Sequence, residues 1–217
     1  MRTGSNDPRP PLADRIGLFF SVGRVVDGLW IGTIDVNDEP VLRRVEEALA
    51  LIKAYDKRRY DRLIKDLERV WVRMLPDELG NFSRALRACV LDTRFVLAET
   101  TSLEILAVVI VHEATHARLR HCGIGYDEQM RHRVEAVCFR RELAFARKLP
   151  KGQPVREWIE NSLEQVPAFD WTDAARAKRD LEGNVEILHH LGAPKWLVRM
   201  MLAVRAWRTR GSKSSPS

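Results

Sequence analysis

Residues 108–118 read VVIVHEATHAR, in which four apolar residues run directly into two histidines with a glutamate between them. The chain has only six histidines, and two of them stand here, at the end of its most apolar segment. Burial of such polar groups costs free energy unless a partner satisfies them. The stretch therefore predicts a polar cluster on a buried face, held either by hydrogen bonds or by a metal ion.

Flanking signals predict that this stretch is helical. Residues 101–104, TSLE, form a capping-box pattern with Thr101 as the N-cap and Glu104 at position N3. The helix would run to about Arg120, where the segment HCGIG supplies two glycines for a C-terminal turn.

On such a helix, His112 and His116 lie four residues apart and share one face, so both imidazoles can reach a single metal ion. Glu113 is offset from His112 by about 100° around the helix axis. It can therefore reach a ligand of the metal rather than the metal itself.

A third ligand is expected because zinc peptidases use three protein ligands and leave the fourth position to water. Glu135 follows His116 after eighteen residues, in a second predicted helix that Asp127 caps and that runs to Leu149. It borders the apolar face of that helix, and an acid in such surroundings needs a partner. A zinc ion is one such partner.

The order HExxH, eighteen residues and then a glutamate on a following helix resembles the gluzincin zinc metallopeptidases, in a minimal form that covers roughly residues 88–149. The resemblance implies that His112, His116 and Glu135 bind Zn²⁺. It also implies that Glu113 acts as the general base on the zinc-bound water and then passes the proton to the leaving amine.

The family binds its peptide substrate in extended form along an edge strand above the active-site helix, and residues 88–98 are the matching segment here. Two features depart from the family. Phe139 stands where many gluzincins have an aspartate that orients a histidine, so the partner of His112 is unassigned. The GxMEN motif of the family's aminopeptidases is absent, so we expect an endopeptidase acting on proteins or peptides.

Transition-state stabilisation usually needs one more hydrogen-bond donor. Tyr126 lies in the turn between the two helices, and His189 and His190 lie about as far after Glu135 as such a histidine does in some relatives. The structural alternatives are that Tyr126 packs on its loop and that the histidine pair is a solvated helix end.

Two other functions remain open. Cys138, on a similar helix face to Glu135, would close a purely structural zinc site if it were a ligand, although a lone helical cysteine is more often a small core residue. The protein would otherwise be a zinc-binding regulatory or interaction module with weak or no peptidase activity, associated with a repressor protein or nucleic acid. Two histidines and a carboxylate also suit other divalent ions.

Composition limits the class of protein. The three cysteines are an odd number without a CxxC pair, which favours a reducing compartment, here the cytoplasm, over a disulfide framework. The N-terminus has no apolar stretch typical of a signal peptide, and the longest apolar run is too short to span a bilayer. The net charge of +6 permits acidic partners but is too mild to predict a nucleic-acid partner.

The patterns predict an α+β, mostly helical protein. Residues 16–36 read as short strands, residues 59–75 fit either a helix or a strand, and residues 88–98 fit one strand or a tight pair. A later helix, capped by Asp170 or Thr172, would reach Leu191, and Pro194 would open a last one. Four units are expected: a flexible N-terminus over 1–13, a zincin-like metallopeptidase core over 14–150, a C-terminal helical subdomain over 151–208 and a flexible tail over 209–217.

Overall fold

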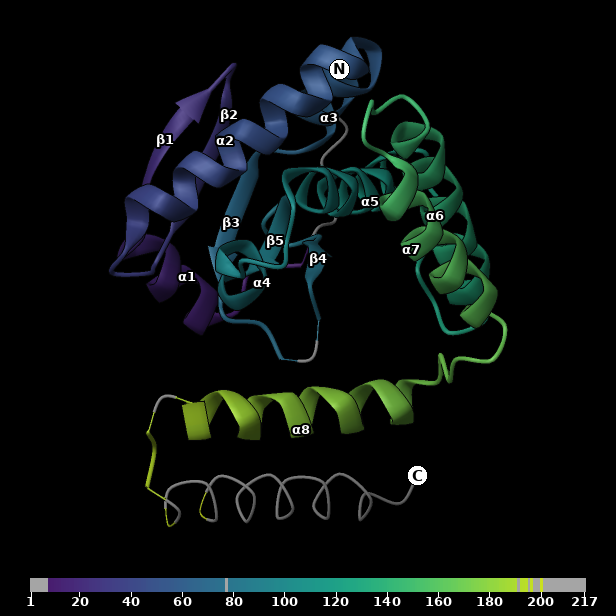
Figure 1. Ribbon diagram of the computed structural model, residues 1–217. Coiled ribbons are helices and arrows are strands. Elements are labelled where there is room, and N and C mark those ends of the chain that lie inside the picture. Colours follow the sequence, from purple (N-terminus) through teal and green to yellow (C-terminus); the bar gives the residue numbers. More distant parts are fainter. Residues whose placement is uncertain (1–7, 77, 191, 195, 197–199, 201–217) are drawn as a thin grey trace.

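The computed structural model describes residues 8–76, 78–190, 192–194, 196 and 200. The prediction of an α+β, mostly helical fold is confirmed: a mixed sheet in the N-terminal half is followed by helices (Figure 1). The strands are β1 (Val22–Val26), β2 (Leu29–Thr33), β3 (Arg69–Arg73), β4 (Gly80–Ser83) and β5 (Ala88–Asp92). The helices are α1 (Leu12–Phe19), α2 (Asp38–Tyr55), α3 (Lys57–Asp66), α4 (Thr93–Leu97), α5 (Leu103–His121), α6 (Arg131–Ala146), α7 (Gln153–Gln165) and α8 (Asp173–His190).

The sheet has the strand order β1-β2-β3-β5-β4. Strands β2, β3 and β5 are parallel to one another, whereas β1 and β4 run antiparallel to their neighbours at the two edges. Central parallel strands are covered on both faces and are apolar throughout. Accordingly, every residue of β5 is buried.

Alternation along the central strands divides the interior between two cores. Val70, Val72 and Leu91 belong to the larger core, which includes the buried faces of α2 and α5. Trp71 and Val90 point to the opposite face, where a smaller core is covered by α1. The sheet therefore holds α5 by one face while α1 closes the other.

The N-terminal segment differs from the predicted strands. A helix, α1, occupies Leu12–Phe19, and strands form only from Val22 onward. The hairpin between β1 and β2 turns at Asp27 and Gly28, which both have positive φ angles, of 49° and 87°. Glycine accepts this conformation without strain, as two-residue hairpin turns require. The ambiguous segment over residues 59–75 contains both elements, a helix that ends at Asp66 and then β3.

The predicted edge strand over residues 88–98 is wrong. Its first half is β5, which lies inside the sheet, and its second half is the short helix α4. The chain turns because the Asp92 carboxylate accepts a hydrogen bond from the Phe95 backbone N–H at 3.1 Å, as an N-cap does. The edge strand next to α5 is β4, which lies between two segments for which the sequence allowed strands, residues 59–75 and 88–98.

Helix boundaries shift by a few residues from those predicted. Ser102, not Thr101, caps α5, and its hydroxyl accepts a hydrogen bond from the Ile105 N–H at 3.2 Å. Asp127 caps a turn that precedes α6 through the Met130 N–H, at 3.0 Å. Helix α6 therefore begins later than predicted and ends at Ala146, and α7 follows within the segment 151–208 that was predicted to be helical.

Helix α8 is the last element with described bounds, and it runs along one side of the molecule (Figure 1). Thr172 caps it, because its hydroxyl accepts the Ala175 N–H at 3.2 Å. Arg94 of α4 pairs with Glu186 of α8 at 3.1 Å and ties the helix to the sheet domain. The predicted helix over residues 194–208 lies largely outside the described residues, and the predicted tail lies wholly outside them.

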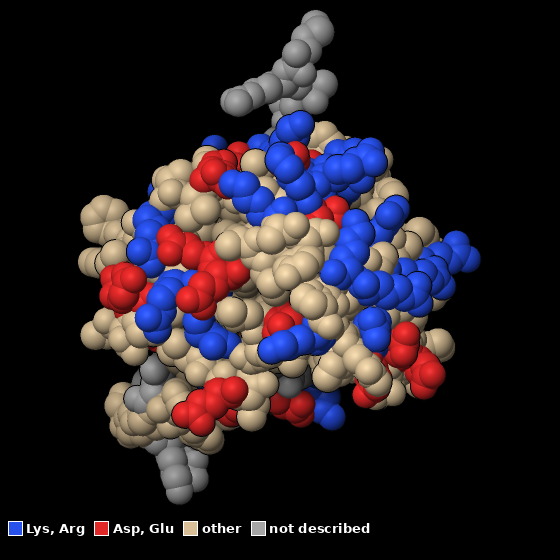
Figure 2. All heavy atoms as spheres, turned by 45° about the horizontal axis from the view of Figure 1, so that its top comes forward, with Lys and Arg blue, Asp and Glu red and all other residues tan. Residues whose placement is uncertain are grey.

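Basic residues dominate part of the surface. Figure 2 shows a broad band of Lys and Arg on the side that is uppermost in Figure 1, where α3 exposes Lys57, Arg58, Arg62 and Lys65. This distribution agrees with the net charge of +6. Among the helices that the structure describes, none is both long and apolar enough to cross a bilayer.

One buried carboxylate joins three helices. Asp56, between α2 and α3, accepts a hydrogen bond from the Arg59 N–H at 3.2 Å and pairs with Arg59 Nε at 3.1 Å. It also accepts a hydrogen bond from Lys148 Nζ, just beyond α6, at 2.8 Å. Burial raises the pKa of Asp56, but the bonds from Lys148 and Arg59 outweigh burial and hold the pKa below 3.8.

We predict that Asp56→Asn lowers the free energy of unfolding by about 1–3 kcal/mol at neutral pH, because it weakens the cap and removes both ion pairs. The lowered pKa means that the unfolded chain binds this proton more readily than the folded one. The stabilisation of the folded state by Asp56 is thus fully present at pH values above the ordinary pKa of an aspartate. It is lost as the pH falls from there through the lower pKa that Asp56 has in the folded protein.

Urea unfolding of both proteins across this pH range measures the effect, and the difference between them should shrink at low pH. Asp61→Asn is the control, because its pair with Lys57 is exposed and is worth at most about 0.5 kcal/mol. Equal stability of Asp56→Asn and wild type at neutral pH would contradict the assignment.

Candidate metal centre

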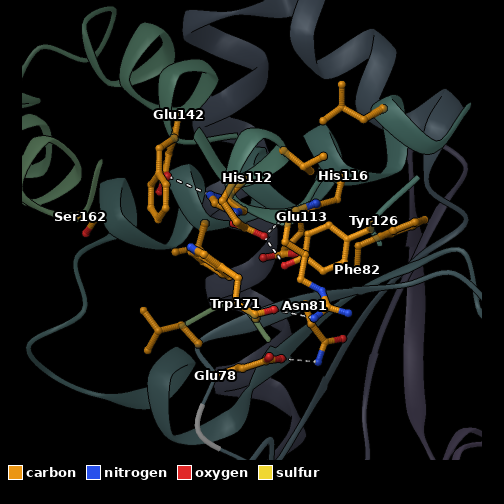
Figure 3. Close-up of a pocket in the computed structure, with 18 of the residues that line it drawn as sticks. Glu78, Asn81, Phe82, His112, Glu113, His116, Tyr126, Glu142, Ser162 and Trp171 are labelled. Atoms are coloured by element: carbon orange, nitrogen blue, oxygen red, sulfur yellow. Dashed lines mark hydrogen bonds and ion pairs between the residues drawn. The ribbon is translucent and has the colours of Figure 1, made fainter. Parts of the chain in front are cut away.

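Helix α5 enters the core from its second turn onward, and residues 106–111 are all buried. The two histidines follow directly, on the side of α5 that faces α6 (Figure 3). Both side chains are largely buried, with His112 12% and His116 13% exposed. The sequence thus delivers two imidazoles to the interface between two helices, where each needs a polar partner.

Glu135 of α6 supplies that partner to both histidines. Its Oε2 lies 3.0 Å from His112 Nε2, and its Oε1 lies 3.3 Å from His116 Nε2. Two ligand atoms of a tetrahedral zinc ion, each about 2.0–2.1 Å from the metal, are themselves about 3.3 Å apart. Each histidine nitrogen thus contacts a different oxygen of the Glu135 carboxylate, at a distance close to that between two such ligand atoms.

Cys138, one turn after Glu135, also reaches this cluster. One ligand atom each from His112, His116 and Cys138 lie within 4.8 Å of one another, so these three residues form a group that could hold a metal ion. Cys138 is fully buried. Burial, followed by the nearby carboxylates, raises the pKa of its thiol well above the usual value.

Glu142 is the residue that sequence reasoning missed. Its Oε2 lies 3.1 Å from His112 Nδ1, so it occupies the role that the absent aspartate at position 139 left unassigned. Phe139 instead packs its ring against the His112 ring, with centroids 4.8 Å apart. A signal was present: Glu142 follows Glu135 by seven residues, which is two helical turns and hence the same face.

The contacts between α5 and α6 favour a protonated His112 on one helix and an ionised Glu135 on the other. Burial disfavours the protonated form of His112, but its hydrogen bonds to Glu135 and Glu142 outweigh burial and raise its pKa. Burial likewise opposes ionisation of Glu135, yet its bonds to His112 and His116 hold its pKa far below the usual value. A bound cation would take over the compensation that the protonated imidazole gives to this carboxylate.

Glu113 lies beside the histidines on α5 and is 6% exposed. Burial raises its pKa to about 7, although His116 and His112 act in the opposite direction. A carboxyl group with such a pKa can both accept and release a proton near neutral pH.

The three candidate donors have different positions. Tyr126 is part of the site, because its hydroxyl donates to Glu135 Oε1 at 2.5 Å and its ring packs edge-on to His116. His189 and His190 are exposed at the end of α8, and neither lines the cavity described next. The structure does not bring these two histidines to the cluster.

A cavity of about 800 Å³ opens onto the cluster, a volume within the range of substrate pockets. His112, Glu113 and Glu135 line it from the helices, and Asn81 and Phe82 line it from β4 (Figure 3). Aromatic and basic residues also line it, among them Trp158, Phe169, Trp171, Arg131, Arg176 and Arg179. The cavity therefore lies between the polar cluster, a sheet edge and the segment that leads into α8.

Comparison of the chain with protein-family models, with curated proteins and with solved structures found no match.

We predict that Glu142→Ala raises the dissociation constant for added Zn²⁺ by about 10- to 100-fold, because the carboxylate holds His112 Nδ1 as a donor and leaves Nε2 free to bind the ion. Competition with a chromophoric chelator measures the affinity. Glu142→Gln keeps an oxygen acceptor and should lose less. Circular dichroism controls for folding, and unchanged affinity in a folded Glu142→Ala protein would refute this role.

Proposed function

We propose that the protein is a zinc-dependent endopeptidase. One observation carries the proposal: the Glu135 carboxylate contacts both histidines of the HExxH motif, at 3.0 and 3.3 Å, at the wall of a large cavity. Three protein ligands and a neighbouring cavity are what a catalytic zinc site needs, because the fourth position must admit water and substrate.

In this proposal His112, His116 and Glu135 hold the ion. Both nitrogens that would bind it already face the Glu135 oxygens. Glu142 orients His112 from the other ring nitrogen, which is the usual outer partner of a zinc-bound histidine. When bound, zinc polarises the scissile carbonyl and activates a water molecule.

Glu113 is the general base. Its carboxylate accepts a proton from the attacking water and then passes that proton to the amine that leaves. Tyr126 is placed to donate a hydrogen bond to the oxyanion that forms on the substrate, once its hydroxyl turns from Glu135 toward the cavity. The side chains needed for peptide hydrolysis thus all face one space.

The substrate in this proposal is an extended peptide. Strand β4 is an edge strand that lies against α5, and its residues 80–82 line the cavity. A peptide can pair with such an edge through its main chain, which gives affinity with little dependence on sequence. β4 replaces residues 88–98 as the predicted binding strand.

The proposed ligand set predicts the metal content of variants. Wild type should hold about one zinc ion per chain, and Glu135→Ala should lose it or bind it far more weakly, because one of three ligands is removed. Cys138→Ala, which removes a side chain one turn away, should keep the ion. Mass spectrometry of purified, zinc-supplied and desalted proteins gives the content.

A second candidate is a structural zinc site closed by Cys138, which the thiol's position within 4.8 Å of both histidine ligand atoms favours. In that case Cys138→Ala would lose the ion and unfold more easily, because a closed site contributes directly to folding. No zinc in any of the three proteins would refute both candidates and leave the histidines as core residues.

Glu113→Gln separates the endopeptidase from a zinc-binding regulatory or interaction module. The amide cannot accept a proton, so cleavage of a peptide library should fall by at least about 100-fold. Zinc content and thermal stability should stay close to wild type, since Glu113 does not bind the ion. If wild type cleaves nothing while it binds zinc, the module is the better assignment.

A further inference from the structure

The arginines that line the cavity include Arg131 of α6 and Arg176 and Arg179 of α8. One of them, Arg131, is committed to the fold. Its Nη1 donates to the Trp171 carbonyl oxygen at 2.7 Å, and its Nη2 pairs with the Asp173 carboxylate, so that it fixes the start of α8. Arg131 is buried as well, and it is therefore not available to a ligand.

Arg179 is also occupied. Both of its terminal nitrogens donate to the Asp170 carbonyl oxygen at 3.2 Å, and its guanidinium lies over the Phe169 ring at 4.4 Å. These contacts hold the loop before α8 against the first turns of the helix. Arg179 therefore already has partners for its terminal nitrogens.

Arg176, between these two, is different. Its guanidinium lies 5.9 Å from the centre of the Tyr126 ring, and among the described residues its side chain has no hydrogen bond and no ion pair within 4.0 Å. Burial raises the pKa of Glu78 on the cavity wall and the charge of Arg176 opposes that rise, but the Glu78 carboxylate accepts its hydrogen bond from Asn81 Nδ2, at 3.1 Å. Five guanidinium donors are thus presented to a cavity without a partner for them.

We propose that Arg176 is a specificity-determining residue that binds a carboxylate of the peptide substrate; this rests on the proposed function. A guanidinium matches a carboxylate through two parallel hydrogen bonds, better than it matches any other group of a peptide. Tyr126 contacts both groups, because its ring lies beside the Arg176 guanidinium and its hydroxyl donates to the Glu135 carboxylate. An extended peptide advances about 3.3 Å per residue, so the recognised group lies within a few residues of the scissile bond.

The other charges in the cavity favour Arg176 as the place where a substrate carboxylate binds. The cavity lining also carries Glu78, Glu113, Glu135 and Glu142, so a peptide carboxylate is attracted to Arg176 rather than to these acids. The net charge of +6 also raises the rate at which an acidic peptide encounters the protein.

The recognised carboxylate comes either from an acidic side chain or from the C-terminus of the substrate, and peptides distinguish the two. A cleaved library sequence is resynthesised with Glu, Gln or Lys at each position near the scissile bond, each with a free or an amidated C-terminus. Cleavage rates are measured with zinc-loaded wild type, and binding is measured with zinc-loaded Glu113→Gln, which does not consume the peptide.

We expect one Glu position, or the free C-terminus, to be preferred over its neutral counterpart by about 10- to 100-fold. Arg176→Gln should abolish that preference and leave cleavage of the neutral peptide nearly unchanged. Arg176→Glu should favour the Lys peptide instead. Lys178→Gln is the matched control, because it removes the same charge from an exposed position on the same helix.

Arg120 lines the cavity from the end of α5, and Arg120→Gln tests whether it recognises the carboxylate instead. The assignment is overturned if Arg120→Gln loses the preference for the acidic peptide while Arg176→Gln keeps it. Cleavage by wild type without any preference for an acid overturns it as well. If no peptide is cleaved and none binds to Glu113→Gln, the proposed endopeptidase fails, which is a distinct result.

Discussion

The fold depends on how α5 and α6 bury ionisable groups at their interface. Three glutamates and two histidines lie there with little solvent, at a cost that only mutual contacts can offset. His112 contacts Glu135 through one ring nitrogen and Glu142 through the other, so a single imidazole satisfies two buried acids. The apolar first half of α5, packed on the sheet, keeps this network in place.

The same arrangement separates the tasks of the two helices. Helix α5 carries His112, Glu113 and His116, and its neighbour α6 carries the acids that contact and orient them. Strand β4 bounds the cavity as an edge with few apolar residues, which suits a surface that pairs with a passing chain. The sheet therefore anchors the site, and in the proposed function its β4 edge would bind the substrate.

Much of the site could be predicted because its signals are local. A spacing of four residues places two histidines on one face, and the spacing to Glu135 places it on the next helix. β4 could not be predicted, because GNFS has no apolar alternation and becomes a strand only by pairing with β5. For His189 and His190 the sequence left two alternatives, and the choice of the exposed helix end depends on where α8 packs, which no local pattern encodes. The helical spacing of Glu142 from Glu135 could have predicted its contact with His112. It was missed because the family places the corresponding acid at position 139.

The two acids on α6 that contact one imidazole also restrict how the helices slide. Apolar helices can often pack in several offsets of similar free energy, since leucine and valine surfaces repeat along the axis. Here a shift of one turn, about 5.4 Å, would leave at least one buried carboxylate without its nitrogen. The His112 imidazole thus favours a single offset of α6 along α5, and it fixes the relative position of the two helices before any ligand binds.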